Sequence, residues 1–293
     1  MADQAKRLST NVGDNFFVDS TCINCDTCRQ LAPKSFVENG EFSSVYRQPA
    51  NERELHQAFQ ALVACPVGSI GAIQNDKAQM KVATASFPLQ LGGEVYYNGF
   101  NSEKSFGANS YFVRHPDGNW LIDSPRYINK LVKAFEGMGG IKYIFLTHED
   151  DVAEASRYAK QFGAARIIHR EDMAALPDAE WVIEGSQAVE FKPEFLLIPV
   201  PGHTRGSMAL LYDNRYLFTG DHMGWDREVN GLRLATVYVW DEPTLRRSTE
   251  RLLDYAFEWV LPGHSDRMRL SADRMQEELR LLLERRKLKV PTP

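Results

Sequence analysis

The chain has few cysteines, no long apolar run and no excess of basic residues. Only four of its 293 residues are cysteine, and no apolar stretch reaches the ~20 residues of a membrane-spanning helix. The formal net charge of −5 gives no electrostatic footprint for nucleic acid or an anionic membrane. The N-terminal stretch MADQAKRLSTNVGDN lacks the apolar region of a secretory signal and the composition of a transit peptide. We therefore expect a cytoplasmic protein with no membrane span and no nucleic-acid partner.

The spacing of the four cysteines indicates an iron–sulfur site. They lie as Cys22-x2-Cys25-x2-Cys28 and, further on, Cys65-Pro66. A short C-x2-C-x2-C run typically binds three corners of a 4Fe–4S cluster, and a distant cysteine before proline supplies the fourth ligand. A structural zinc site or disulfides are the alternatives, but zinc more often uses two paired C-x2-C arms. With every cysteine in one cluster, none remains for a disulfide, which fits a reducing compartment.

Residues 14–76 form the first predicted domain. FFVD and VGSIGAI are typical of strands, and ERELHQAFQALVACP carries Leu55, Phe59 and Leu62 at helical spacing. This pattern around the cysteines resembles the small monocluster bacterial-type ferredoxins, which carry single electrons. The following NDKAQMKVATASFP is interpreted as a polar connector over about 75–88.

The second predicted domain covers 89–270, and a C-terminal helix and tail cover 271–293. Strand patterns (EVYYNGF, SYFVRH, NWLIDS, IKYIFLTH) alternate with helix patterns (YINKLVKAFEGMG, DEPTLRRSTERLLDYAFE), and EDDVAEASRYAKQFG also predicts a helix, ending at Gly163. MALLYD and YLFTGD predict a hairpin. These patterns indicate an α+β protein.

Histidine or aspartate follows four of the predicted strands, in LTHEDD, PVPGHTRGS, LFTGDH and VLPGHSD. Zinc and iron bind imidazole nitrogen and carboxylate oxygen. We therefore expect a metal site from residues at one edge of a sheet, namely His148, His203, Asp221 and His264.

These segments resemble the metallo-beta-lactamase superfamily. LIDS, PGHTRGS, FTGD and LPGH match its strand-end motifs in the family's order. The resemblance implies a four-layer αββα sandwich with a metal cleft at the strand ends. Many members are hydrolases with one or two metals, some are iron oxidoreductases and some are inactive scaffolds.

The chain departs from the family at its main ligand motif, T-H-x-H-x-D-H. The sequence here is THEDDVAEA from Thr147. When the chain is aligned with that motif, Ala153 stands at the position of a ligand histidine. When it is aligned with T-H-x-D-D-V-x-D-H, the pattern of members fused to a ferredoxin, Ala155 stands at that position. Asp150 and Glu154 are the remaining candidates, and four residues apart at a helix start they can share a face. The resemblance therefore implies at most one iron or zinc ion.

The remaining histidines and three aromatic residues are expected to be structural. His222 is interpreted as a residue that supports the ligands or is exposed, His169 as a loop residue, and His56 and His115 as surface residues. An insertion after the FTGD segment carries three aromatic side chains that we expect to pack in the core. They are Trp225, Tyr238 and Trp240.

Two classes of function follow from these two halves. In one, a ferredoxin module supplies electrons to, or regulates, a metal-dependent oxidoreductase or hydrolase, with a glyoxalase-II-like thioester hydrolase as the purely hydrolytic form. In the other, the sandwich is a non-catalytic scaffold for electron transfer or partner docking. Both predict a redox partner protein, and the first predicts a small-molecule substrate. Fusions of this layout resemble those of cyanobacteria and chloroplasts, so the chloroplast stroma is the alternative location if a transit peptide has been removed.

Overall fold

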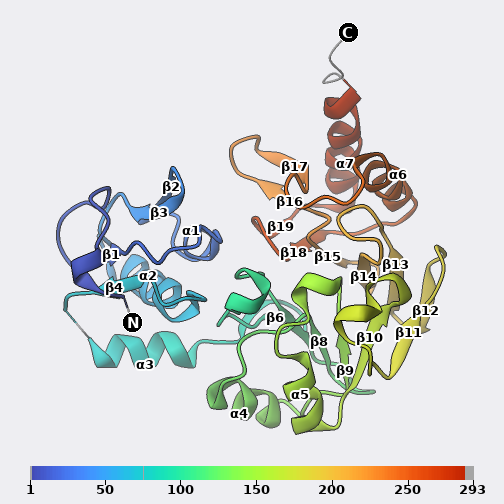
Figure 1. Ribbon diagram of the computed structural model, residues 1–293, viewed down its shortest axis with the longest axis horizontal. Coiled ribbons are helices and arrows are strands. Elements are labelled where there is room, and N and C mark those ends of the chain that lie inside the picture. The colour runs from blue at the N-terminus through green and yellow to red at the C-terminus, as the bar shows by residue number, and fades with distance from the viewer. Residues whose placement is uncertain (1, 75, 288–293) are drawn as a thin grey trace. The chain divides into compact units, whose positions relative to one another are not determined.

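The computed structural model describes residues 2–74 and 76–287 (Figure 1). The chain divides into two compact units. The first unit contains residues 1–142 and 153–162, and the second contains 143–152 and 163–293. The domains expected from the sequence, 14–76, 89–270 and 271–293, were drawn from sequence patterns, whereas these two units are defined by compactness. The expected domain boundaries therefore stay a prediction. Residues 288–293 of the expected tail lie outside the described residues.

The first unit begins with the cysteine-bearing segment. Its elements are η1 (Gln4–Lys6), β1 (Phe16–Val18), α1 (Thr27–Leu31), β2 (Phe36–Asn39), β3 (Phe42–Val45), α2 (Glu52–Ala64), β4 (Ile70–Ala72) and α3 (Lys77–Ala85). β1 pairs antiparallel with β4, and β2 with β3. The Asn51 side chain accepts a hydrogen bond from Glu54 N at 3.0 Å, which caps α2. Phe59 of α2 packs against Phe16 of β1 with ring centroids 5.1 Å apart, so the helix and the strand pair share one core.

The segment expected to be a polar connector contains the helix α3. Asp76 caps it by accepting hydrogen bonds from the backbone N–H groups of Ala78 and Gln79. Among the α3 residues only Ala83 is buried. Because the helix buries so little, its sequence has almost no apolar periodicity, and the connector prediction was wrong here for that reason.

The rest of the first unit consists of β5 (Leu89–Gly92), β6 (Val95–Tyr97), η2 (Glu103–Ser105), β7 (Tyr111–Val113), β8 (Trp120–Ile122), α4 (Asn129–Gly137) and α5 (Ala155–Phe162). Strands β5 to β8 pair antiparallel in chain order. Phe135 of α4 stacks on Phe112 of β7 at 4.8 Å and meets Tyr158 of α5 at 5.8 Å. These rings form the core of this part of the unit.

The helix predicted over 149–163 is interrupted. A short turn, η3 (Glu149–Asp151), is followed by Ala153 with φ +30°, and α5 begins only at Ala155. Glu149 N donates to the Asp172 carboxylate instead of starting a helix, and Glu154 N donates to Ser124 Oγ. The inference that Asp150 and Glu154 share a helix face was therefore wrong.

The second unit carries the strand ends that bear histidine and aspartate. Its elements are β9 (Tyr143–Phe145), η3, β10 (Ala165–His169), η4 (Arg170–Ala175), β11 (Trp181–Ile183), β12 (Val189–Lys192), β13 (Phe195–Pro199), β14 (Met208–Tyr212), β15 (Tyr216–Gly220), β16 (Met223–Asp226), β17 (Gly231–Leu234), α6 (Glu242–Arg251), η5 (Leu252–Asp254), β18 (Trp259–Pro262), β19 (Met268–Arg269) and α7 (Ala272–Lys287). β10 pairs in parallel with β9 and β11. A six-stranded sheet has the order β12-β13-β14-β15-β18-β19.

Helices α6 and α7 cover an apolar core with this six-stranded sheet. Leu245 of α6 and Met275 and Leu279 of α7 are fully buried with Val260 of β18. Burial on this scale favours the folded state because it removes apolar area from water. The described residues contain no helix that is long and apolar enough to cross a membrane.

Candidate functional site

The four cysteines lie on two segments of the first unit. Cys22, Cys25 and Cys28 occupy the loop from β1 into α1, and Cys65 directly follows the last residue of α2. Asn24 and Asp26 have φ values of +56° and +68°, so the backbone turns sharply between successive cysteines. Cys28 and Cys65 are buried, Cys22 and Cys25 are half-buried, and none of the four is in a disulfide.

Hydrogen-bond donors surround the sulfur atoms. Burial raises the pKa of Cys65, while the backbone N–H groups of residues 67–69 lower it in part. Burial also raises the pKa of Cys25 to about 11, against hydrogen bonds from Thr27. A buried thiol of raised pKa becomes a thiolate when a metal takes the place of its proton. The N–H and O–H donors are then available to stabilise ligating sulfur.

The spread of the four sulfurs fits a cluster better than a single zinc ion. Tetrahedral zinc holds sulfur at about 2.3 Å, which places its ligands only about 3.8 Å apart. Among the described residues, no three cysteine sulfurs lie within 4.8 Å of one another. Donor atoms come that close at another site, which contains His148, His203 and Asp221. The four cysteines therefore fit the larger 4Fe–4S group, whose corners each take one thiolate.

The second unit gathers the side chains that follow its strands. His148 follows β9, His203 follows β13, Asp221 follows β15 and His264 follows β18. Ligand atoms of His148, His203 and Asp221 all lie within 4.8 Å of one another. Asp221 Oδ2 lies 3.6 Å from His148 Nε2, 3.8 Å from His203 Nε2 and 3.7 Å from His264 Nε2. The strand-end residues singled out in the sequence are thus brought together around one carboxylate.

Asp150 lies at the same group. Its Oδ2 is 3.7 Å from His148 Nε2 and 3.5 Å from His203 Nε2. Nitrogen and oxygen ligands held at about 2.0–2.1 Å around one tetrahedral ion lie about 3.3–3.4 Å apart. These two separations are close to this value, so Asp150 can join the two imidazoles at an ion, but the donors that all lie within 4.8 Å of one another are His148, His203 and Asp221 without Asp150.

Buried polar atoms at this site also fit a metal. His203 is 5% exposed, and its Nδ1 and Asp221 Oδ1 make no hydrogen bond within the described residues. Burial by itself raises the pKa of Asp221, but attraction to the His264 and His148 imidazoles outweighs it and holds that pKa well below the usual range. A persistent carboxylate between imidazoles is a suitable ligand for a divalent cation.

The motif glycine before His264 is required by close packing. A Cβ on Gly263 would lie 2.4 Å from Asp221 Oδ1 and 3.1 Å from Asp151 Oδ2. Asp151 is buried, and its Oδ2 lies 3.9 Å from His148 Nδ1. The acidic run of the sequence therefore contributes a buried carboxylate, Asp151, that the motif comparison did not single out.

Glu154, the other ligand candidate, is engaged elsewhere. Its carboxylate forms ion pairs with Lys104 Nζ at 2.9 Å and Arg157 Nη1 at 3.3 Å. Glu154 is not part of the group of converging donors, and Ala155 has no donor atom. The described residues therefore offer ligands for one ion.

The other histidines occupy structural positions. His222 is buried with Nε2 2.8 Å from Thr249 Oγ1, and burial lowers its pKa to about 3. His169 ends β10, and its Nε2 lies 2.9 Å from Gly185 O. His56 and His115 are half-buried.

The core prediction for the aromatic insertion is right for one residue of three. Trp225 is buried in β16. Tyr238 is 86% exposed and Trp240 is 50% exposed, so the core prediction was wrong for both. They follow the β16–β17 hairpin, where Arg205 lies 5.0 Å above the Trp240 ring. A cation over this ring compensates for the missing core contacts.

Asp172 connects the two histidine loops, and no motif pointed to it. It is 0% exposed, and its carboxylate accepts hydrogen bonds from Glu149 N at 3.1 Å, Thr204 Oγ1 at 2.5 Å and Gly206 N at 2.8 Å. Glu149 follows His148, and Thr204 follows His203. Asp172 therefore holds both ligand loops in place.

Replacing Asp172 with asparagine is expected to weaken metal binding by about 10–100-fold, the cost typical of losing a residue that orients ligands. One amide face cannot accept hydrogen bonds, so at least one of the three donors loses its partner. Zinc affinity measured by chelator competition tests this. Asp178→Asn is the matched control because Asp178 is exposed and pairs with Arg166. Equal zinc affinity in Asp172→Asn and wild type would contradict the positioning role.

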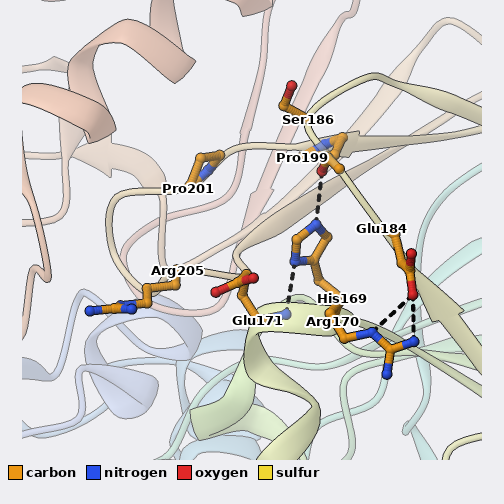
Figure 2. A pocket seen from close by; sticks show the side chains of 9 residues that line it. His169, Arg170, Glu171, Glu184, Ser186, Pro199, Pro201 and Arg205 are labelled. Atoms are coloured by element: carbon orange, nitrogen blue, oxygen red, sulfur yellow. Dashed lines mark hydrogen bonds and ion pairs between the residues drawn. The ribbon is translucent and has the colours of Figure 1, made fainter.

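A cavity of about 520 Å³ lies beside the His203 loop (Figure 2). Pro199, Pro201 and Arg205 contribute from the chain around His203, and His169 and Glu184 contribute from the opposite side. Figure 2 shows the ion pair between Arg170 and Glu184 at one edge of the cavity and Arg205 at the other. The cavity therefore has an apolar proline wall and charges of both signs.

Comparisons with known proteins match both segments. Residues 18–72 match the family described as the 4Fe-4S single cluster domain of Ferredoxin I. Residues 93–239, half of the chain, match the metallo-beta-lactamase superfamily. A solved structure of DIM-1 metallo-beta-lactamase superposes with a TM-score of 0.52 at 13% identity, covering 67% of this chain and 96% of that one. This likeness shows the fold of the second part.

Two curated relatives are distant. Hydroxyacylglutathione hydrolase of Acidiphilium cryptum (strain JF-5) is 28% identical over 116 residues, which span 38% of this chain and 47% of that protein. The chain thus matches about half the length of this relative. The protein YobT of Bacillus subtilis (strain 168) is 26% identical over 209 residues, 59% of this chain and 90% of that protein. With a matching fold and both family matches in place, this chain belongs to the metallo-beta-lactamase superfamily and carries an N-terminal 4Fe–4S ferredoxin domain.

Proposed function

We propose that this protein is a redox metalloprotein in which the ferredoxin domain supplies single electrons for chemistry at one metal ion. Cys22, Cys25, Cys28 and Cys65 would hold the 4Fe–4S cluster. The observation that carries the proposal is the convergence of two imidazoles and one carboxylate within 4.8 Å, from His148, His203 and Asp221.

Two histidines and one carboxylate with open positions are typical of mononuclear non-haem iron sites, and zinc hydrolases use a similar set. When bound, the ion would act as a Lewis acid and, if it is iron, would also accept single electrons. The ferredoxin domain favours iron, because hydrolysis needs no electron donor. Some functional coupling between the two cofactors is therefore the simplest reason for the fusion.

The chain's own residues supply charge and proton chemistry at this site. Asp221 offsets the positive charge of an ion. The Asp150 side chain is 61% exposed, and the His203 imidazole beside it lowers its pKa, so it is a carboxylate at neutral pH. It can bind the ion or accept a proton from a bound water. His264 is 31% exposed beside Asp221 and can contact a substrate from the solvent side.

The cavity next to the His203 loop is the proposed place for the substrate. Its volume of about 520 Å³ suits a small molecule. Its wall carries Arg205, Arg170, Glu171 and Glu184, so a polar substrate with groups of both charges would find partners there. A redox partner protein is proposed to reduce the cluster.

Stopped-flow reoxidation tests the coupling. We expect dithionite-reduced full-length protein to recover its visible absorbance faster when mixed with a small electron acceptor such as dioxygen than His203→Ala does. The reason is that only the wild type retains the second metal. Equal recovery rates for every acceptor tried would argue that the metal site takes no electrons from the cluster.

A hydrolase is the second candidate, favoured by the match to a hydroxyacylglutathione hydrolase over 116 residues. In that case zinc-loaded protein would release thiol from acyl-glutathione thioesters, and His203→Ala would not. A sandwich that binds no metal would leave the third possibility, a scaffold for electron transfer or partner docking.

A further inference from the structure

A buried asparagine from outside the ferredoxin segment contacts the cysteine loop. Asn101 lies in the loop between β6 and β7 and is 0% exposed. Its Nδ2 donates to Thr27 Oγ1 at 3.0 Å and to Gly107 O at 2.7 Å. Thr27 belongs to the segment 18–72, and Asn101 belongs to 93–239. Buried hydrogen bonds within the first unit therefore join the two family-matched segments.

The orientation of the Asn101 amide follows from its partners. Gly107 O can only accept a hydrogen bond, so the amide nitrogen faces it. The amide oxygen then accepts from Tyr97 Oη at 2.9 Å. Both ends of the amide are thus held in a buried site, where such a network is rigid.

The Thr27 hydroxyl has two possible acceptors at the same distance. Its Oγ1 lies 3.3 Å from Cys25 Sγ and 3.3 Å from Gly107 O. Hydroxyl-to-oxygen bonds are usually about 2.7–2.8 Å long, so the bond to Gly107 O is weak, and this oxygen already accepts from Asn101. Sulfur is larger, and a cluster-bound sulfur can only accept. The hydroxyl hydrogen is therefore directed to Cys25 Sγ.

Close packing shows that this loop is shaped to the cysteine. Gly107 has φ +85°, and a Cβ there would lie 2.6 Å from Cys25 Cβ and 2.9 Å from Cys25 Sγ. A side chain at position 107 would push the loop away and break the bonds to Thr27. The Gly107 backbone can approach Cys25 only because the residue is glycine.

We propose that Asn101 is a positioning residue for the cluster, which aims the Thr27 hydroxyl at Cys25 Sγ and so raises the reduction potential of the 4Fe–4S cluster. Reduction adds one electron and makes the ligating sulfurs more negative. A hydrogen bond to sulfur is then stronger in the reduced state, and it favours reduction. This inference needs the cluster but neither the second metal nor any enzymatic activity.

Midpoint potentials of the full-length protein, titrated with dithionite and followed by electron paramagnetic resonance, test the proposal. Thr27→Val is expected to shift the equilibrium between reduced and oxidised cluster toward the oxidised form by up to about tenfold, about 59 mV for a one-electron couple. Thr27→Ser keeps the hydroxyl and should stay near the wild type. Asn101→Leu should lower the potential in wild-type protein but add nothing in the Thr27→Val background, because Asn101 acts through Thr27.

Asn98→Leu is the matched control, since Asn98 is also buried near this loop but donates to Ser110 Oγ. It should leave the potential unchanged. The proposal is overturned if Asn101→Leu has the wild-type potential, or if its shift is as large in the Thr27→Val background. Should Asn101→Leu lose its iron and sulfide, Tyr97→Phe takes its place in the same cycle. In that case the proposal is overturned if Tyr97→Phe has the wild-type potential. It is also overturned if Tyr97→Phe shifts the potential as much in the Thr27→Val background as in the wild type.

Discussion

Replacing Cys25 with serine is expected to abolish the broad visible absorbance of an iron–sulfur cluster. The cluster needs four thiolates, and the chain has no fifth cysteine to substitute for one that is lost. The half-buried Cys25 also packs against Gly107 and is hydrogen-bonded to Thr27, so its sulfur has a fitted place that a serine oxygen would not fill. Absorbance, iron and acid-labile sulfide of anaerobically purified protein measure the effect.

Ser43→Ala is the matched control for this substitution. The Ser43 hydroxyl hydrogen-bonds Cys28 Sγ, so the control removes a hydrogen bond at a ligating sulfur but keeps all four thiols. We expect its iron and sulfide content to match the wild type. An unaltered spectrum in Cys25→Ser would mean that Cys25 is not a ligand, and the cluster assignment would fail.

Replacing His203 with alanine is expected to remove the metal from the second unit. The substitution deletes one of three imidazoles that lie 3.6–3.8 Å from Asp221. Of the three converging donors it leaves only His148 and Asp221, which are too few for tight binding. The loss of affinity should exceed the ~10–100-fold cost of removing a supporting residue. Metal content after dialysis against a weak chelator is the measurement.

His169→Ala is the control here, because His169 is also a buried strand-end histidine of the same unit but contacts Gly185 O. It should retain the metal, and both variants should retain the cluster. If His203→Ala keeps as much non-cluster metal as the control, the ion binds somewhere else.

The sequence predicted the parts of both sites that depend on local patterns. Cysteine spacing predicted Cys22, Cys25, Cys28 and Cys65 as the cluster ligands, which stays a prediction, and the predicted helix leading into Cys65 agrees with α2. His203, Asp221 and His264 could be placed together because they follow β13, β15 and β18 of one sheet, but His148 follows β9 of another sheet, so the expectation of a single sheet edge was wrong for it. Both predictions needed only motif order and strand periodicity.

The remaining features depend on contacts between distant segments. Asp172 is recognisable as a support only once Glu149 and Thr204 are beside it. Asn101 is 74 residues from Thr27, and no sequence pattern links the two. The break before α5 likewise depends on backbone hydrogen bonds to Asp172 and Ser124 rather than on helix propensity. Propensities and motifs describe residues that are close in the sequence, so they cannot predict hydrogen bonds between segments that are far apart in the chain.

The most direct test is the iron, zinc, manganese and acid-labile sulfide content per chain of anaerobically purified wild-type protein. The account predicts one 4Fe–4S cluster and one further equivalent of metal, with iron favouring a redox enzyme and zinc a hydrolase. A full cluster with no further metal, even after incubation with iron and zinc salts, would contradict a working site at His148, His203 and Asp221. The sandwich would then be a scaffold beside an electron carrier.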